Sequence, residues 1–201
     1  MKILNLYAGI GGNRKLWSDE HEVTAVENNK KIAKIYQDFF PKDKVIVCDA
    51  HQYLLEHYKE FDFIWSSPPC PTHSRMRHLH HIKETSRPTP YPDMKLWQEI
   101  IFLKHWFKGK WVVENVMSYY EPLIKPYISG NHMFWSNFII SKTEKVFRDI
   151  RRSGRKEKWS FNISKYDVEQ KSLVLNNMVY PELGLYIFKC AFSDIQNKLK
   201  G

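Results

Sequence analysis

The chain has 201 residues, of which 43% are hydrophobic and 15% aromatic, so it can form one substantial domain, alone or with a small appendage, and is not disordered. Its three cysteines, Cys48, Cys70 and Cys190, show no CxxC spacing, which argues against a disulfide framework and a thiolate zinc site. The net charge of +9 indicates a polyanionic partner, although surplus charge can also serve solubility.

The predicted elements alternate between short apolar runs and helical patterns, which is typical of βα units and a parallel sheet. In chain order we expect strands at 3–6 and 23–26, a helix at 29–40, a strand at 45–48, a helix at 51–57, a strand at 61–65, a helix from Pro92 closed by Gly109, strands at 111–113 and 134–140, and a last helix at 181–198. Residues 71–91 lack periodicity and predict a long loop. The fold class expected is a Rossmann-like, doubly wound α/β domain.

The ends of the first three predicted strands carry groups that suit a nucleoside. In open α/β sheets, ligands bind outside the carboxyl ends of the strands. The first strand runs into a turn with Gly9, Gly11 and Gly12, the second ends at Glu27 and the third at Asp49. The turn allows close approach to the backbone, while the two carboxylates can accept hydrogen bonds from ribose hydroxyls and from an exocyclic amine. Together they predict an adenosine site.

A dinucleotide-binding dehydrogenase is the first rival interpretation. Its GxGxxG fingerprint would need a third glycine where this chain has Arg14. It also has no evident use for Cys70, which stands in the proline-rich stretch SSPPCPTHS at residues 66–74.

Cys70 and Glu114 follow the fourth and fifth predicted strands, so they can meet over one small substrate. A thiolate is a nucleophile, and basic surroundings favour its formation. A carboxyl group can protonate or hydrogen-bond a ring nitrogen. The plainer alternatives are a structural thiol in a turn and a salt-bridged glutamate at the sheet edge.

Seven short motifs follow one another along the chain, namely LYAGIGG at 6–12, VEN at 26–28, CDA at 48–50, SSPPCPTHS at 66–74, ENV at 114–116, MFWSNF at 133–138 and NNMVYPELG at 176–184. In these motifs and in their order, the chain resembles the DNA (cytosine-5) methyltransferases over most of its length. Two features depart from the family pattern. Pro71 stands where a glutamine often follows the cysteine, and His132 is the best match to a base-contacting arginine. The histidine could still donate a hydrogen bond, or it could be plain surface.

The resemblance implies S-adenosylmethionine as cofactor and S-adenosylhomocysteine as product. The methionine end would lie over the glycine turn, with Glu27 on the ribose and Asp49 on the adenine amine. The full set of cofactor-binding residues implied is Tyr7, Ala8, Gly9, Ile10, Gly11, Gly12, Glu27, Asn28, Asp49, Ala50, Pro68, Asn177 and Val179.

It also implies methylation of cytosine C5 in double-stranded DNA, on a base flipped from the duplex. Cys70 would add to C6 while Glu114 engages N3, and loss of the C5 proton and the thiolate would complete the cycle. The residues expected to contact substrate are Pro69, Ser74, Arg75, Arg77, Asn115, His132, Arg148, Arg151, Arg152 and Arg155. No metal is expected, because His78, His80 and His81 lack acids or cysteines at convincing ligand spacing.

The expected organisation is a catalytic core at 1–140, a small basic target-recognition element at 141–170 and a final motif with a helix at 171–201. Residues 141–158 hold eight Lys and Arg against three acids. Phosphate contacts position a protein without reading sequence, so this short element predicts short or loose specificity. A solvated charged face is the alternative.

Two further functional alternatives stay open, namely a tRNA cytosine-5 methyltransferase and a non-catalytic homologue that binds DNA or stimulates a partner. We expect a monomer in the cytoplasm of a prokaryotic or phage-type host, with a cognate restriction system as a candidate partner. The sequence contains no evident signal peptide and no apolar run near the roughly 20 residues that span a membrane. Trp97, Trp106 and Trp111 are expected in the core.

Overall fold

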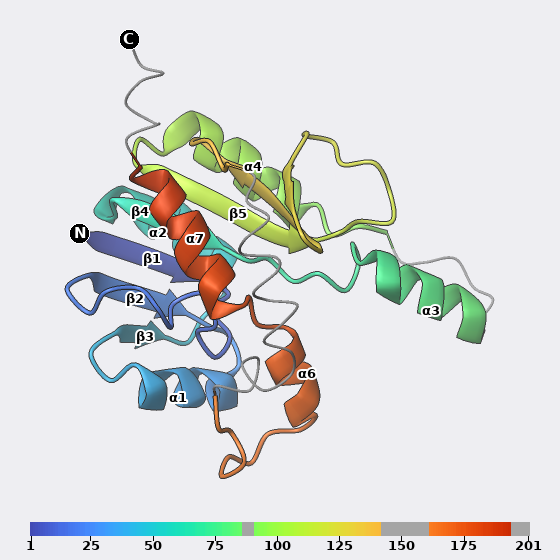
Figure 1. The fold of residues 1–201 in the computed structure, drawn as a ribbon, viewed down its shortest axis with the longest axis horizontal. Helices are drawn as coiled ribbons and strands as arrows, with labels where there is room; N and C mark the ends of the chain where they lie inside the picture. The colour runs from blue at the N-terminus through green and yellow to red at the C-terminus, as the bar shows by residue number, and fades with distance from the viewer. Residues whose placement is uncertain (86–90, 142–160, 194–201) are drawn as a thin grey trace.

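The computed structural model describes residues 1–85, 91–141 and 161–193. Within them, one seven-stranded sheet has the order β3-β2-β1-β4-β5-β7-β6, and β7 alone runs opposite to the other six strands (Figure 1). The strands are β1 (Lys2–Leu6), β2 (Glu22–Val26), β3 (Lys44–Ile46), β4 (Phe63–Ser66), β5 (Lys110–Val116), β6 (Tyr127–Ser129) and β7 (His132–Ser136). The helices are α1 (Lys30–Phe39), α2 (Ala50–His57), α3 (Arg75–Thr85), α4 (Lys95–Trp106), α6 (Lys171–Asn176) and α7 (Pro181–Ala191), with a 3₁₀ turn at Tyr58–Glu60.

The sheet is covered on both faces, which confirms the expected Rossmann-like, doubly wound α/β fold. On one face, Ile3 and Val23 pack with Leu183 and Ile187 of α7. On the other, alternate residues of the same strands pack with α2 and α4, as Leu4 does in the cluster that contains Leu54 and Ile100. The parallel strands therefore bury side chains on both faces, which explains why they read as nearly continuous apolar runs. No helix within the described residues is long and apolar enough to cross a membrane.

Several expectations about local structure are wrong. The last helix ends at Ala191 rather than at residue 198, the strand expected at 134–140 ends at Ser136, and the helix expected from Pro92 begins at Lys95. The predicted loop contains α3, which projects away from the sheet and leaves the side chain of Met76 77% exposed (Figure 1). Ser74 begins this helix, because its hydroxyl accepts from the Arg77 amide at 3.3 Å. A helix that packs against little has no apolar periodicity to reveal it. Trp106 is 56% exposed rather than in the core, whereas Trp97 and Trp111 are buried as predicted.

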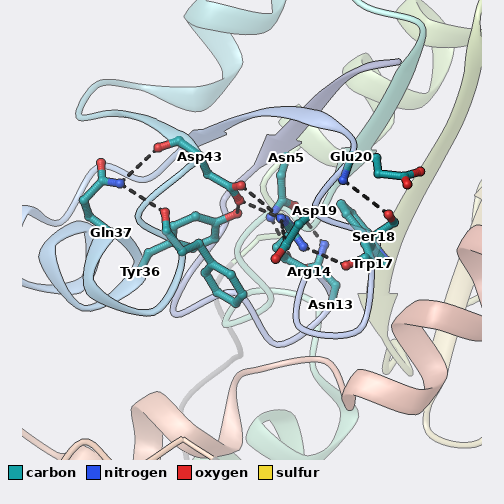
Figure 2. A network of polar contacts seen from close by, with 11 residues as sticks. Asn5, Asn13, Arg14, Trp17, Ser18, Asp19, Glu20, Tyr36, Gln37 and Asp43 are labelled. Atoms are coloured by element: carbon teal, nitrogen blue, oxygen red, sulfur yellow. Dashed lines mark hydrogen bonds and ion pairs between the residues drawn. The ribbon is translucent and has the colours of Figure 1, made fainter.

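A buried ion pair anchors the glycine turn to the rest of the fold (Figure 2). The Arg14 guanidinium contacts both carboxylate oxygens of Asp43, at 2.9 and 3.0 Å, and both side chains are nearly fully buried. Tyr36 of α1 donates its hydroxyl to the same carboxylate at 2.8 Å. Beside them, the Asn13 and Asn5 side-chain amides bond each other, which joins the turn to β1. Arg14, at the position that excluded the dinucleotide fingerprint, is thus a structural residue.

Replacing Arg14 with methionine should lower the free energy of unfolding by about 3–5 kcal/mol, because the Asp43 carboxylate would stay buried without its partner. Urea denaturation of the wild type and the variant measures this difference. Asp19→Asn is the matched control, because the Asp19 side chain also bonds Arg14 but is 69% exposed. That variant should lose less than about 1 kcal/mol. Equal losses in the two variants would contradict a special role for the buried pair.

Candidate active site

A cavity of about 440 Å³ lies at the carboxyl ends of the parallel strands. Its wall is built from six segments of the chain and two single side chains, Arg77 and His132. The segments contribute lining residues from 7–13, 27–32, 49–50, 67–71, 114–116 and 174–179. Nearly all residues predicted from the first three strand ends and from the cysteine loop therefore meet around one hollow. Among the predicted residues in the described ranges, Gly11, Ser74 and Arg75 do not line it.

The glycine turn after β1 contributes open backbone to the cavity. Gly9 has φ +55°, and a Cβ built there would meet no atom within 4 Å. Gly12 lies so close to the segment before α7 that an added Cβ would come within 2.3 Å of the Val179 carbonyl oxygen. Gly11 instead packs closely against the Phe40 ring, which a Cβ added at this position would meet. The turn thus offers space at Gly9 and joins the final motif at Gly12.

The two strand-end carboxylates are held by backbone amides. Glu27 accepts from the amides of Gly9 at 3.0 Å and Asn29 at 2.9 Å. Asp49 caps α2 by accepting from the Gln52 amide at 2.9 Å, and this bond is the main reason that its pKa is lowered. A carboxylate offers about four acceptor positions, so both groups retain capacity for a ligand.

Cys70 lines the cavity from the loop that follows β4. The loop is fixed by main-chain hydrogen bonds to the segment after β5. The Arg75 amide donates to the Met117 carbonyl at 2.9 Å, and the Tyr119 amide donates to the His73 carbonyl at 3.1 Å. Burial raises the pKa of the Cys70 thiol, the nearby charge of Glu114 adds to the rise, and Arg77 opposes it. The thiol therefore needs added positive charge to ionise near neutral pH.

Glu114 lies inside β5 rather than at its end, because β7 pairs with β5 as far as Val116. Its carboxylate is 2.7 Å from Nδ1 of His132, the first residue of β7, and both side chains line the cavity. His132 is therefore not plain surface. The neighbouring Asn115 donates its side-chain amide to the Pro68 carbonyl at 3.0 Å, which ties β5 to the cysteine loop.

Four predicted substrate contacts, Arg148, Arg151, Arg152 and Arg155, lie outside the described residues. Just after them, Phe161 and Ile163 pack with Ile35 of α1 and Leu175 of α6. The C-terminal part of the expected recognition element is thus attached to the core.

One buried carboxylate next to the cavity, Glu99 of α4, was not predicted from the sequence. Tyr7 and Ser66 donate hydroxyl hydrogen bonds to it at 2.5 and 2.6 Å, and Nδ1 of His51 lies at 3.1 Å. Bonding to Glu99 raises the pKa of His51, with a smaller opposing effect of burial. The one signal in the sequence is an acid between Leu96 and Ile100 on the apolar face of a helix.

Comparison with known families identifies the chain. Residues 1–122, more than half of its length, match the family model of the C-5 cytosine-specific DNA methylase. The chain belongs to this family. The family is one of methyltransferases, and membership implies S-adenosylmethionine as the methyl donor. It also indicates a nucleic-acid substrate. A comparison with curated proteins finds no match.

Solved structures similar to this methylase-family chain share only part of its length. A hypothetical protein of Thermus thermophilus is 14% identical with a TM-score of 0.46, covering 67% of this chain and 73% of that one. A mutant DNMT2 of Spodoptera frugiperda is 28% identical with a TM-score of 0.40, covering 57% and 35%. A putative prophage DNA modification methyltransferase of E. coli is 16% identical with a TM-score of 0.38, covering 60% and 33%. This chain thus spans about a third of the last two proteins.

The cavity of this DNA methylase relative fits an adenosine-bearing sulfonium compound. A side chain at Gly9 would project into open space rather than against protein, so the glycine leaves room for a ligand against the backbone. Glu27 and Asp49 present carboxylate oxygens from adjacent strand ends of the same cavity, on the chain segments predicted to hold a nucleoside. Their negative charge also suits a cationic ligand.

Proposed function

We propose that this protein methylates C5 of cytosine in double-stranded DNA through a covalent bond between Cys70 and C6 of a flipped base. The observation that carries the proposal is the convergence of a thiol and a carboxyl, Cys70 and Glu114, on the cavity that also contains Glu27 and Asp49. A protein that only binds DNA would have no need for a thiol and a carboxyl group, Cys70 and Glu114, beside a donor site.

The donor would be held by the glycine turn and the first three strand ends. Its methionine part would contact residues 7–12, its ribose Glu27 and its adenine amine Asp49. The remaining contacts would come from Asn28, Ala50, Pro68, Asn177 and Val179, although Gly11 would contribute only through the packing described above. When bound, S-adenosylmethionine supplies the methyl group and a positive sulfonium charge.

The chain's own residues would carry the base chemistry. The Cys70 thiolate forms the C6–S bond, and the C5–C6 π electrons move through C4 toward N3. Glu114, bonded to His132, engages N3 and stabilises the electron-rich ring, which makes C5 nucleophilic. After C5 is methylated, loss of the C5 proton restores the double bond and expels the thiolate. Pro69 and Pro71 flank the cysteine and restrict its backbone.

The duplex would be bound mainly through its phosphates. Arg77 already lines the cavity, Ser74 and Arg75 lie at the start of the projecting helix α3, and Asn115 and His132 lie beside the base site. The arginines of residues 148–155 would add phosphate contacts. Because such contacts do not read sequence, we expect a short or loose recognition site. Methylation mapping on random duplexes tests this, and a single long strict site would contradict it.

Transfer of tritium from labelled S-adenosylmethionine tests the substrate. The protein is incubated with duplex DNA or with tRNA under the same conditions, and we expect label in the DNA. Label only in tRNA would assign the protein to RNA. Label in neither, with S-adenosylhomocysteine still bound, would indicate a non-catalytic homologue.

A further inference from the structure

We propose that Glu99 is a positioning residue for the methyl-donor pocket. Glu99 does not line the pocket itself, but it holds together three chain segments that do. This inference rests on the proposed function only in taking the cavity as the donor site. None of the residues of α4 lines the cavity, so Glu99 would act through its neighbours.

Glu99 is an unusual residue for its surroundings. Its side chain is fully buried on the face of α4 that also buries Leu96, Ile100 and Leu103. Burying a carboxylate among apolar groups is costly unless donors surround it. Here Tyr7, Ser66 and His51 all contact the carboxylate, so most of its acceptor positions are occupied and the charge lies in a hydrogen-bond network.

The three contacts to Glu99 come from three different segments at this edge of the sheet. Tyr7 directly follows β1 and lines the cavity, and His51 lies in the first turn of α2, next to the lining residue Ala50. Ser66 is the last residue of β4, next to the lining residue Ser67. One carboxylate therefore joins the segments that surround the proposed adenosine and sulfonium positions.

Tyr7 gives the clearest sign that the network shapes the pocket. Its φ of +54° is a left-handed conformation that is unfavourable for a residue with a Cβ. The bond from its hydroxyl to Glu99 holds the far end of the side chain and so keeps the backbone in this conformation immediately before the glycine turn. Burial and the charge of Glu99 raise the pKa of Tyr7, so the hydroxyl remains a donor at all physiological pH values.

The same face of α4 also reaches Asp49. Lys95 stands one turn before Glu99, and its ammonium lies 3.6 Å from the Asp49 carboxylate. This ion pair, like the bonds of Tyr7 and His51 to Glu99, lies on the proposed donor side of the cavity. None of these bonds goes to Cys70 or Glu114. Changes at Glu99 should accordingly affect binding of the donor rather than the chemistry on the base.

The test compares binding of S-adenosylhomocysteine, measured by calorimetry, in the wild type, Glu99→Gln, Tyr7→Phe and the double variant. Glutamine keeps the size of Glu99 but replaces one acceptor oxygen with a donor amide. We expect Kd to rise about tenfold in Glu99→Gln. Tyr7→Phe should raise Kd in the same direction, and the double variant should be less impaired than the product of the two single effects. With saturating donor, kcat of Glu99→Gln should change less than about threefold.

Phe188→Leu is the control for a merely structural role, because Phe188 belongs to α7 and packs on the opposite face of the sheet. It should lower Tm while leaving Kd for S-adenosylhomocysteine unchanged. If Glu99→Gln and Tyr7→Phe both bind S-adenosylhomocysteine with the wild-type Kd, the role of Glu99 is overturned while the donor site stands. An equal rise in Kd in Phe188→Leu would overturn the role of Glu99 in the same way. Absence of binding by the wild type would overturn the donor site itself. If Glu99→Gln fails to fold, Tyr7→Phe tests the proposal in its place. This variant keeps the aromatic ring at position 7 and the Glu99 carboxylate, and it removes only the hydroxyl that joins them.

Discussion

Replacing Cys70 with serine is expected to reduce methyl transfer by roughly 10³-fold or more, because a hydroxyl cannot take the place of the thiolate at C6. The variant should also fail to form a covalent complex with duplex DNA containing 5-fluorocytosine. In that substrate the C5 proton is replaced by fluorine, so the wild-type enzyme should stay bonded through sulfur and migrate with the DNA on a denaturing gel. Tritium transfer and the gel measure the two effects.

Cys190→Ala is the matched control for Cys70, because it removes a thiol that is buried on the α7 face of the sheet. It should form the complex and transfer label as the wild type does. Equal labelling by Cys70→Ser and the wild type would contradict the covalent mechanism. The raised pKa of Cys70 adds a second readout. Alkylation of the ligand-free protein by iodoacetamide should be slow at pH 7 and should increase as pH rises beyond the usual pKa of cysteine.

Replacing Glu114 with glutamine is expected to reduce kcat by about 10²–10⁴-fold, because an amide cannot deliver a proton to N3 of cytosine. The change conserves size, and Glu114 has a hydrogen-bond partner in His132 that the variant can still contact. Folding should therefore be preserved. Single-turnover tritium transfer, with Tm measured beside it, separates the catalytic loss from a loss of stability.

His132→Arg is the informative companion of Glu114→Gln. Arginine can donate to Glu114 from the position of His132, whose Nδ1 lies 2.7 Å from the Glu114 carboxyl group, and it stays charged at every physiological pH. We expect this variant to keep transfer within about tenfold of the wild type. Full activity of Glu114→Gln would contradict a role of this carboxyl in the chemistry. A large loss in His132→Arg would show that an imidazole is specifically required.

The strand ends could be predicted from sequence because their signals are local. Apolar runs followed by Gly9, Glu27 and Asp49 already place these groups at one edge, since parallel strands share their direction. The cavity lining agrees with that prediction. Cys70 could be placed for the same reason, because it follows β4 by only a few residues.

The rest depends on contacts between residues far apart in the chain. The sequence placed Glu114 at the end of its strand, whereas antiparallel pairing with β7 extends β5 to Val116. No local sequence pattern indicates this pairing. Glu99 meets Tyr7 across 92 positions of sequence, and no periodicity indicates which face of a helix will meet a hydroxyl. The helix α3 was missed for the opposite reason, since it makes few contacts and its residues show no buried stripe.

The main-chain bonds between residues 73–75 and 117–119 have a consequence for how a nucleotide would be received. They link the loop of Cys70 to the segment that follows the strand of Glu114, and the bond from Asn115 to Pro68 adds a further link. The segments that carry Cys70 and Glu114 are therefore fixed to each other, so the distance between the thiol and the carboxyl group is set before DNA binds. The distortion needed to bring a pyrimidine between them would fall on the polynucleotide, so a mismatched or unpaired target should react faster than one in a perfect helix.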